Sequence, residues 1–222
     1  MPGSLSCRLF RSPKISTSTL RQKLHDYRRT TKDEGAPRPL VENVTEFRVS
    51  HGVARFTYQY DFVDTIPYRD ETQKIVRTAA AEVAAVDPQG ENLYYIYGRA
   101  KVADAIRLRI GRILAGNEDL IEDVIIPPER LRKLLAEDAV ELKFGWWDGI
   151  DTYARKGALK GNVFKSKYYN DFKKGVPISV MFESKSNGRT IRISTSGSVT
   201  FYGRDLKPTE LEQYVVDCIL EG

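Results

Sequence analysis

Residues 46–63, EFRVSHGVARFTYQYDFV, decide the fold class of this chain. Apolar and polar side chains alternate on both sides of His51-Gly52, with Phe47 and Val49 before this pair and Phe56 and Tyr58 after it. A period of two is typical of a strand with one buried face. Two such runs around a short turn predict an antiparallel hairpin. The sequence therefore predicts a fold built on antiparallel sheet.

The rest of the chain adds further strands and several helices. Asn187-Gly188 stands between two β-rich runs and predicts a second hairpin, because this dipeptide suits a two-residue turn. A further turn at residues 195–197 leads into a strand over 198–203. Helices are expected where apolar stripes or start and stop residues occur, over residues 17–29, 74–86 and 99–116, after Pro128 and after Pro208.

These elements predict an α+β fold with antiparallel sheets covered by helices, in two β-rich halves behind a basic N-terminal arm. Residues 30–40, TTKDEGAPRPL, are polar and rich in proline and glycine, which indicates a linker. We therefore divide the chain into a basic arm and linker at 1–40, a β/α unit at 41–118 and a sheet-and-helix unit at 119–222.

The composition excludes several classes of protein. The 222 residues include only two cysteines and two histidines, which excludes a disulfide scaffold and a Cys/His zinc cluster of ordinary spacing. No apolar run approaches the ~18–20 residues that span a bilayer, and the first residues lack the apolar stretch of a secretory signal. We therefore expect a cytoplasmic protein. The glycine-rich motifs GxxxxGK(S/T) and GxGxxG are absent, so no cofactor is expected.

The net charge of +5 is concentrated in two zones, residues 1–32 and residues 152–175. In the second zone aromatic residues, among them Tyr153, Phe164 and Phe172, alternate with basic ones. Ammonium groups can meet phosphates while aromatic faces stack on bases. The alternative is a solvated loop whose aromatic residues anchor it to the core. The candidate nucleic-acid-binding residues are Arg155, Lys156, Lys160, Lys165, Lys167, Tyr168, Tyr169, Lys173 and Lys174, with Arg28 and Arg29 from the first zone.

Residues 190–203, TIRISTSGSVTFYG, resemble the repeat of TATA-box-binding proteins. In that family, paired strands around a Ser-Gly turn precede a helix that lies on the sheet. The matching residues are Ile193, Ser196, Gly197, Val199, Phe201 and Gly203. The resemblance implies a sheet-and-helix unit, and a stand-alone DNA- or RNA-binding protein is the alternative function that goes with it.

Residues 43–95 resemble the N-terminal lobe of Argonaute proteins. That lobe opens with Asn, Phe and Val, continues with Tyr-x-Tyr and Pro, and later carries Asp-Gly and Leu-Tyr. The matching residues are Asn43, Phe47, Val49, Phe56, Tyr58, Tyr60, Pro67, Asp87, Gly90, Leu93 and Tyr94. The spacing departs from the pattern between Asn43 and Phe47 and between Asp87 and Gly90. Residues 119–222 would correspond to the linker regions beside that lobe.

This resemblance implies a function and a partner. A chain of 222 residues is too short for the guide-end-binding and nuclease halves of a full Argonaute. It is therefore expected to be a stand-alone N-terminal lobe from a split prokaryotic defence system. Its partner would be a separate short Argonaute-type protein. The pair would hold a guide–target duplex of DNA or RNA and read it through backbone and shape. The expected role is non-catalytic, so the chain is not expected to be an enzyme.

Two other classes of function stay open. Asp171, Glu183 and Lys185 resemble the Asp…Glu-x-Lys layout of restriction-type nucleases, in which carboxylates hold Mg²⁺. The Pro-Asp pair of that layout is missing, and a solvated edge strand is the other reading of Glu183. The third class is a purely structural subunit. Of Trp146 and Trp147, one ring is expected in the core and the other at an interface.

Overall fold

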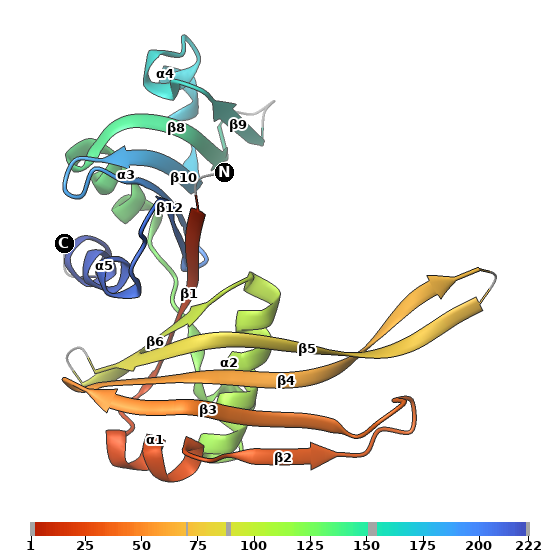
Figure 1. The fold of residues 1–222 in the computed structure, drawn as a ribbon. Coiled ribbons are helices and arrows are strands. Elements are labelled where there is room, and N and C mark those ends of the chain that lie inside the picture. Colours follow the sequence, from red (N-terminus) through yellow and green to blue (C-terminus); the bar gives the residue numbers. More distant parts are fainter. Residues whose placement is uncertain (1–2, 70, 88–89, 151–154, 221–222) are drawn as a thin grey trace. The chain divides into compact units, whose positions relative to one another are not determined.

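The structure is a computed structural model, which describes residues 3–69, 71–87, 90–150 and 155–220. These residues group into two compact units. The central unit is Phe10–Glu122, and the terminal unit takes its described residues from 1–9 and 123–222. Each unit consists of antiparallel sheet with a few helices (Figure 1), which agrees with the predicted α+β class.

The central unit is built on strands that pair in the order β2-β3-β4-β5-β6. Every pair in this series is antiparallel. The predicted hairpin at His51-Gly52 is confirmed, because Ser50 pairs with Val53 and both turn residues have positive φ. The strands are β2 (Arg28–Thr31), β3 (Leu40–Ser50), β4 (Val53–Tyr68), β5 (Glu71–Val86) and β6 (Glu91–Tyr97).

Two helices, α1 (Thr17–Leu24) and α2 (Ala100–Ala115), pack on this sheet (Figure 1). Leu24 of α1 and Ile106 of α2 are fully buried in one core with Phe56 of β4. The helix predicted over 99–116 is confirmed as α2, and it ends at Gly116, which has left-handed backbone geometry. The short helix η1 (Glu118–Leu120) follows it.

The helix predicted over residues 74–86 is wrong, because these residues belong to strand β5. β5 pairs with β4 along its whole length, from Tyr68 opposite Glu71 to Ala54 opposite Ala85. Ala81 lies opposite the buried ring of Tyr58, and its small side chain leaves room for that ring. Cross-strand pairing and burial therefore override the helix propensity of alanine.

β4 and β5 continue beyond their neighbours as a two-stranded ribbon (Figure 1). Among the described residues, the pairing of β4 with β3 reaches Tyr60, and the pairing of β5 with β6 reaches Val83. From Asp61 onward β4 pairs with β5 alone. The ribbon is a feature that the sequence did not reveal.

The terminal unit is built on a second antiparallel series, in the order β1-β12-β11-β10-β8-β9. Residues 185–189, which include Asn187-Gly188, connect β10 to β11, so the second predicted hairpin is confirmed, with a loop longer than two residues. The two-residue strand β7 (Glu122–Asp123) stands where the chain passes from one unit to the other. The strands are β1 (Gly3–Pro13, as far as Leu9 in this unit), β8 (Ala139–Asp148), β9 (Lys156–Lys160), β10 (Val176–Ser184), β11 (Thr190–Ser194) and β12 (Ser198–Gly203).

Helices α3 (Pro128–Glu137) and α5 (Pro208–Tyr214) pack on one face of this sheet (Figure 1). The α5 helix continues as the π-helical turn η3 (Val215–Leu220). Leu131 of α3 and Leu211 of α5 are fully buried, and the rings of Phe201 and Tyr214 meet edge to face with centroids 5.6 Å apart. The helices predicted after Pro128 and Pro208 are thus confirmed. In the residues that the structure describes, no helix is long and apolar enough to cross a membrane.

A separate basic arm is not what the first residues form. Residues 3–8 pair with 198–203, and Cys7, Leu9 and Phe10 of β1 are buried. The residues expected to form a linker contribute β2 and the β2–β3 connection, in which Arg38 bonds Asp61. Basic residues stand between the buried positions of β1, so the sequence pattern did not indicate a strand there. The limits 1–40, 41–118 and 119–222 stay predictions about domains.

Candidate nucleic-acid interface

The candidate residues of the terminal unit lie on one segment, 155–175, between β8 and β10. The segment contains β9, the short helix η2 (Val163–Lys165) and the helical turn α4 (Tyr169–Phe172). β9 is an edge strand of the series and pairs with β8, with Gly157 opposite Trp147. The segment is therefore fixed to the sheet at its start and again where β10 begins.

Trp147 anchors this segment to the core. The rings of Phe172 and Tyr169 meet its ring edge to face, with centroids 5.7 and 6.5 Å away. Phe164 in turn packs against Tyr169 at 5.3 Å. For these three aromatic residues the core-anchor alternative describes what the structure shows.

Gly145 allows the Trp147 ring to lie across β8. A Cβ atom at Gly145 would stand 2.0 Å from a ring carbon of Trp147, far inside van der Waals contact. Trp147 is 2% exposed and Trp146 is 43% exposed, so the prediction that one of the two rings is buried is confirmed. An interface role for Trp146 stays a prediction.

The basic side chains of the segment are exposed. Lys156 lies 3.8 Å from a carboxylate oxygen of Asp148, and Lys174 lies 3.0 Å from one of Asp171. The remaining candidates have no carboxylate partner within the described part of the chain, and they are Arg155, Lys160, Lys165, Lys167 and Lys173. Most of the positive charge on this segment is thus not neutralised by acidic residues that the structure describes.

Tyr168 is the candidate aromatic residue that is most open to solvent. Its side chain is 53% exposed, and Nζ of Lys167 stands 5.0 Å from the ring centroid. This arrangement places an aromatic ring beside a cation. Proteins bind single-stranded nucleic acid through such groups, because bases stack on the ring and the cation attracts phosphates. Tyr153, another aromatic residue of this zone, lies outside the described residues.

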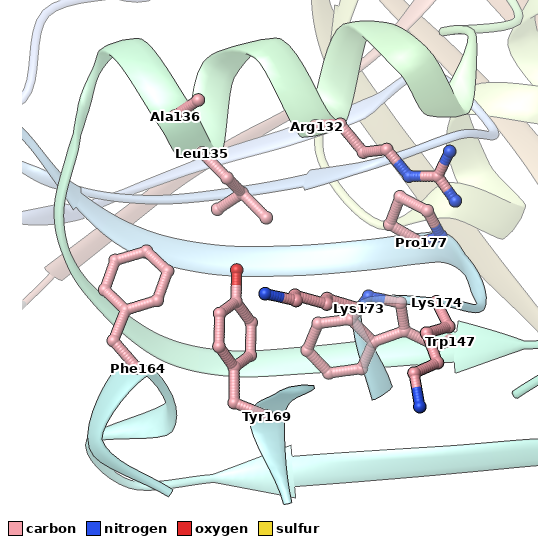
Figure 2. Close-up of a pocket in the computed structure, with 9 residues that line it drawn as sticks. All are labelled: Arg132, Leu135, Ala136, Trp147, Phe164, Tyr169, Lys173, Lys174 and Pro177. Carbon is pink, nitrogen blue, oxygen red and sulfur yellow. The ribbon is translucent and has the colours of Figure 1, made fainter. Parts of the chain in front are cut away.

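A cavity of about 660 Å³ opens beside this segment (Figure 2). Its aromatic and basic residues come from both the segment and the elements that flank it. No acidic side chain stands among the residues that line it, which are Arg132, Leu135, Ala136, Trp147, Phe164, Tyr169, Lys173, Lys174 and Pro177. The cavity therefore combines an apolar wall with a positive rim.

The sequence did not indicate that Arg132 belongs to this site. It lies on α3, next to the buried Leu131, and its guanidinium donates a hydrogen bond of 2.7 Å to the backbone carbonyl of Gly175. That bond fixes Arg132 at the end of the basic segment. The proximity depends on how α3 packs on β10, so no local pattern could have revealed it.

Arg28 and Arg29 lie in the central unit and do not join this cavity. Both are exposed on β2, the strand at the edge of the central series. Charged side chains on an edge strand also discourage pairing with other chains, which is a structural reason for their presence. Their contact with nucleic acid stays a prediction.

The residues of the nuclease alternative have separate partners. Glu183 pairs with Lys143 at 3.1 Å, while Asp171 pairs with Lys174. Lys185 donates a hydrogen bond to the carbonyl of Glu137. Among the described residues, no group of three or more His, Cys, Asp or Glu side chains could hold a metal ion.

Comparison with known proteins adds no relative to these observations. No family model, no curated protein and no solved structure matches the chain.

Proposed function

We propose that this chain binds nucleic acid through residues 155–174 of the terminal unit. The observation that supports the proposal is the set of exposed basic side chains without carboxylate partners in the described chain, above all Lys160, Lys165 and Lys167. Basic side chains of this kind can neutralise phosphates, and the release of condensed counterions favours binding. The proposed binding therefore depends on a local excess of positive charge.

The support beneath these charges favours recognition by backbone and shape. Phe172 and Tyr169 hold the segment on Trp147, so the lysines project from a packed base. Phosphate contacts made by side chains on a rigid support hold a strand of nucleic acid in position, but they do not read its sequence. The proposed ligand is therefore DNA or RNA recognised without base-specific contacts from these lysines.

The proposal includes a partner chain. Residues 43–95, which resemble the N-terminal lobe of Argonaute proteins, form most of the sheet of the central unit, namely β3, β4, β5 and the first part of β6. On the strength of that resemblance, we propose a non-catalytic subunit that pairs with a separate short Argonaute-type protein. The two chains would together enclose a guide–target duplex, and Arg28 and Arg29 would add contacts from the central unit.

Charge reversal tests the binding proposal. The variant K160E/K165E/K167E is compared with K133E/R204E/K207E, which changes three other exposed basic residues of the same unit by the same total charge. Fluorescence anisotropy with labelled single-stranded and double-stranded oligonucleotides, at several salt concentrations, gives the affinity. We expect the first variant to lose at least tenfold more affinity than the second. Equal losses would show that only net charge matters, and salt-independent binding would remove phosphate contacts as its basis.

Co-expression with a short Argonaute-type protein tests the partner proposal. We expect the two chains to co-purify and the pair to bind a guide–target duplex more tightly than either chain alone. Failure to co-purify would overturn the partner but leave the binding proposal intact. Mg²⁺-dependent cleavage by the isolated chain, abolished by Glu183→Ala, would instead favour the nuclease alternative.

A further inference from the structure

The cavity beside the basic segment has an unusual set of polar groups. Three of its lining residues are basic and, as described, none is acidic. Lys174 forms an ion pair with Asp171, and Arg132 donates a hydrogen bond from one of its N–H groups to the carbonyl of Gly175. Lys173 has no carboxylate partner among the residues described. Within the described residues, the cavity therefore holds one ammonium group without a carboxylate partner, and a guanidinium that has further N–H groups available for a ligand.

Tyr169 lines the cavity together with Lys173. Figure 2 shows the hydroxyl of Tyr169 directed toward Leu135. The side chain is half-buried, and burial raises the pKa of its phenol. Its ring has aromatic neighbours, but its hydroxyl has no hydrogen-bond partner in the described chain. A half-buried donor without a partner is satisfied by water or by a ligand oxygen.

The apolar wall of the cavity favours a different chemical group of the ligand from the one that the basic residues favour. Phe164, Leu135 and the edge of Trp147 line the cavity together with Pro177. Such a wall favours a flat or apolar ring and not a bare inorganic anion. The volume of about 660 Å³ lies within the range of roughly 300–1,000 Å³ that is typical of sites for small organic ligands.

We propose that this cavity binds a nucleoside monophosphate unit. The phosphate meets Lys173 and the hydroxyl of Tyr169, and the base packs against Phe164 and Leu135. The inference rests on the proposed function for its choice of ligand class, since it names the unit of nucleic acid that the terminal unit holds. The same chemistry has two sources, a nucleotide within a bound strand or a free mononucleotide.

AMP is the probe for the test. Equilibrium dialysis with labelled AMP measures binding to the full chain, with adenosine and inorganic phosphate as competitors. The variant Trp146→Phe removes the exposed ring and leaves Trp147 as the one tryptophan, whose emission then reports on the cavity. We expect saturable AMP binding that changes this emission, and at least tenfold weaker competition by adenosine or phosphate alone. No saturable binding of AMP would overturn the inference.

Two substitutions locate the site, each with a control in the same unit. Tyr169→Phe keeps the ring and removes the hydroxyl, and Lys173→Ala removes the ammonium group. We expect each to weaken AMP binding about tenfold or more, as the loss of a hydrogen bond to a charged group does. The controls Tyr202→Phe and Lys133→Ala change residues of the same unit outside the cavity and should leave AMP binding unchanged. Equal losses in variants and controls would overturn the inference.

Competition with oligonucleotides distinguishes a nucleotide of a bound strand from a free mononucleotide. It also distinguishes the cavity inference from the proposed function. Competition of single-stranded DNA with AMP assigns the cavity to a nucleotide of a bound strand, and AMP binding without such competition assigns it to a free nucleotide. Strand binding that persists in a chain without AMP binding overturns the cavity inference and leaves the proposed function standing. AMP binding in a chain that binds no strand does the reverse.

Discussion

The phenol of Tyr214 donates a hydrogen bond to Oδ2 of Asp138, 2.8 Å away, and both side chains are buried. Asp138 ends α3 and Tyr214 lies in α5, so this bond joins the two helices that pack on one face of the terminal sheet. Burial alone would raise the pKa of Asp138, but hydrogen bonds from Ser184, Ser186 and Tyr214 outweigh it and hold the pKa below its ordinary value. The ionised carboxylate is therefore a stabilising element of the fold.

Asp138→Asn is expected to lower the free energy of unfolding by about 2 kcal/mol at pH 7, because hydrogen bonds to charged groups contribute about 1.5–3 kcal/mol. The lowered folded-state pKa means that the stabilisation is present above the unfolded pKa of about 3.9 and is lost as the pH falls through the folded value. Urea unfolding at pH 7 and pH 3 measures the difference. We expect the difference between parent and variant to be smaller at pH 3 than at pH 7, while the exposed Asp119→Asn matches the parent at both. An equal loss at both pH values would contradict the role of the charge.

Gly145→Ala is expected to destabilise the terminal unit by about 1–3 kcal/mol, the range for overpacking in a filled core. The added Cβ would stand 2.0 Å from the Trp147 ring, so the ring must leave its place beneath the basic segment. Urea unfolding followed by tryptophan emission measures the change. The same substitution in a Trp147→Phe background should cost less, since the smaller ring relieves the clash. Full additivity of the two changes would show that they do not interact.

Shortening the β4–β5 ribbon is expected to leave the central unit folded. In the variant, Asn-Gly replaces residues 63–76 and joins Phe62 to Arg77, which already face each other across the hairpin. An isolated two-stranded hairpin is only marginally stable, so its removal should change the free energy of unfolding by less than about 1 kcal/mol. Phe56→Ala, at the buried end of β4, should cost about 3–5 kcal/mol in the same assay. A larger loss from the shortened ribbon than from Phe56→Ala would show that the ribbon is part of the core.

Lys160→Ala is expected to reduce the salt dependence of nucleic-acid binding. Each phosphate contact contributes about 0.7–0.9 to the slope of log K against log salt concentration, so losing one contact lowers the slope by about that amount. Anisotropy titrations from low to high salt give the slope for Lys160→Ala and for the control Lys133→Ala. An unchanged slope in Lys160→Ala would show that this side chain touches no phosphate.

Local signals predicted the elements that depend on local chemistry. His51-Gly52 forms the expected two-residue turn, Asn187-Gly188 lies in the loop of the expected second hairpin, and Gly116 ends α2 in the expected left-handed geometry. Each of these depends on the backbone freedom of one or two residues, which the sequence states directly. The burial of one of the two adjacent tryptophans was likewise predictable from the size of the ring.

Features that depend on distant partners were not predictable in the same way. Residues 74–86 are strand because β4 pairs with them, and Cys7 is buried because Val199 lies opposite in β12. At the candidate site the lysines of 155–174 were identified from their charge, but Arg132 reaches the cavity only through the packing of α3. Periodicity within one segment carries no information about such contacts.

The terminal unit takes its strands from both sides of the central unit in the chain, and this has a consequence for synthesis. The ribosome delivers all of Phe10–Glu122 before Ser198–Gly203, the strand that pairs with residues 3–8, has been translated. The central unit can thus fold on the nascent chain. Until β12 has been translated, the β1 residues before Phe10 lack this pairing strand, and Cys7 is exposed to solvent and oxidants. Folding ends with a long-range pairing, which is intrinsically slow. For the same reason, residues 123–222 expressed alone would lack β1, so dividing the chain between the units would not yield a complete terminal unit.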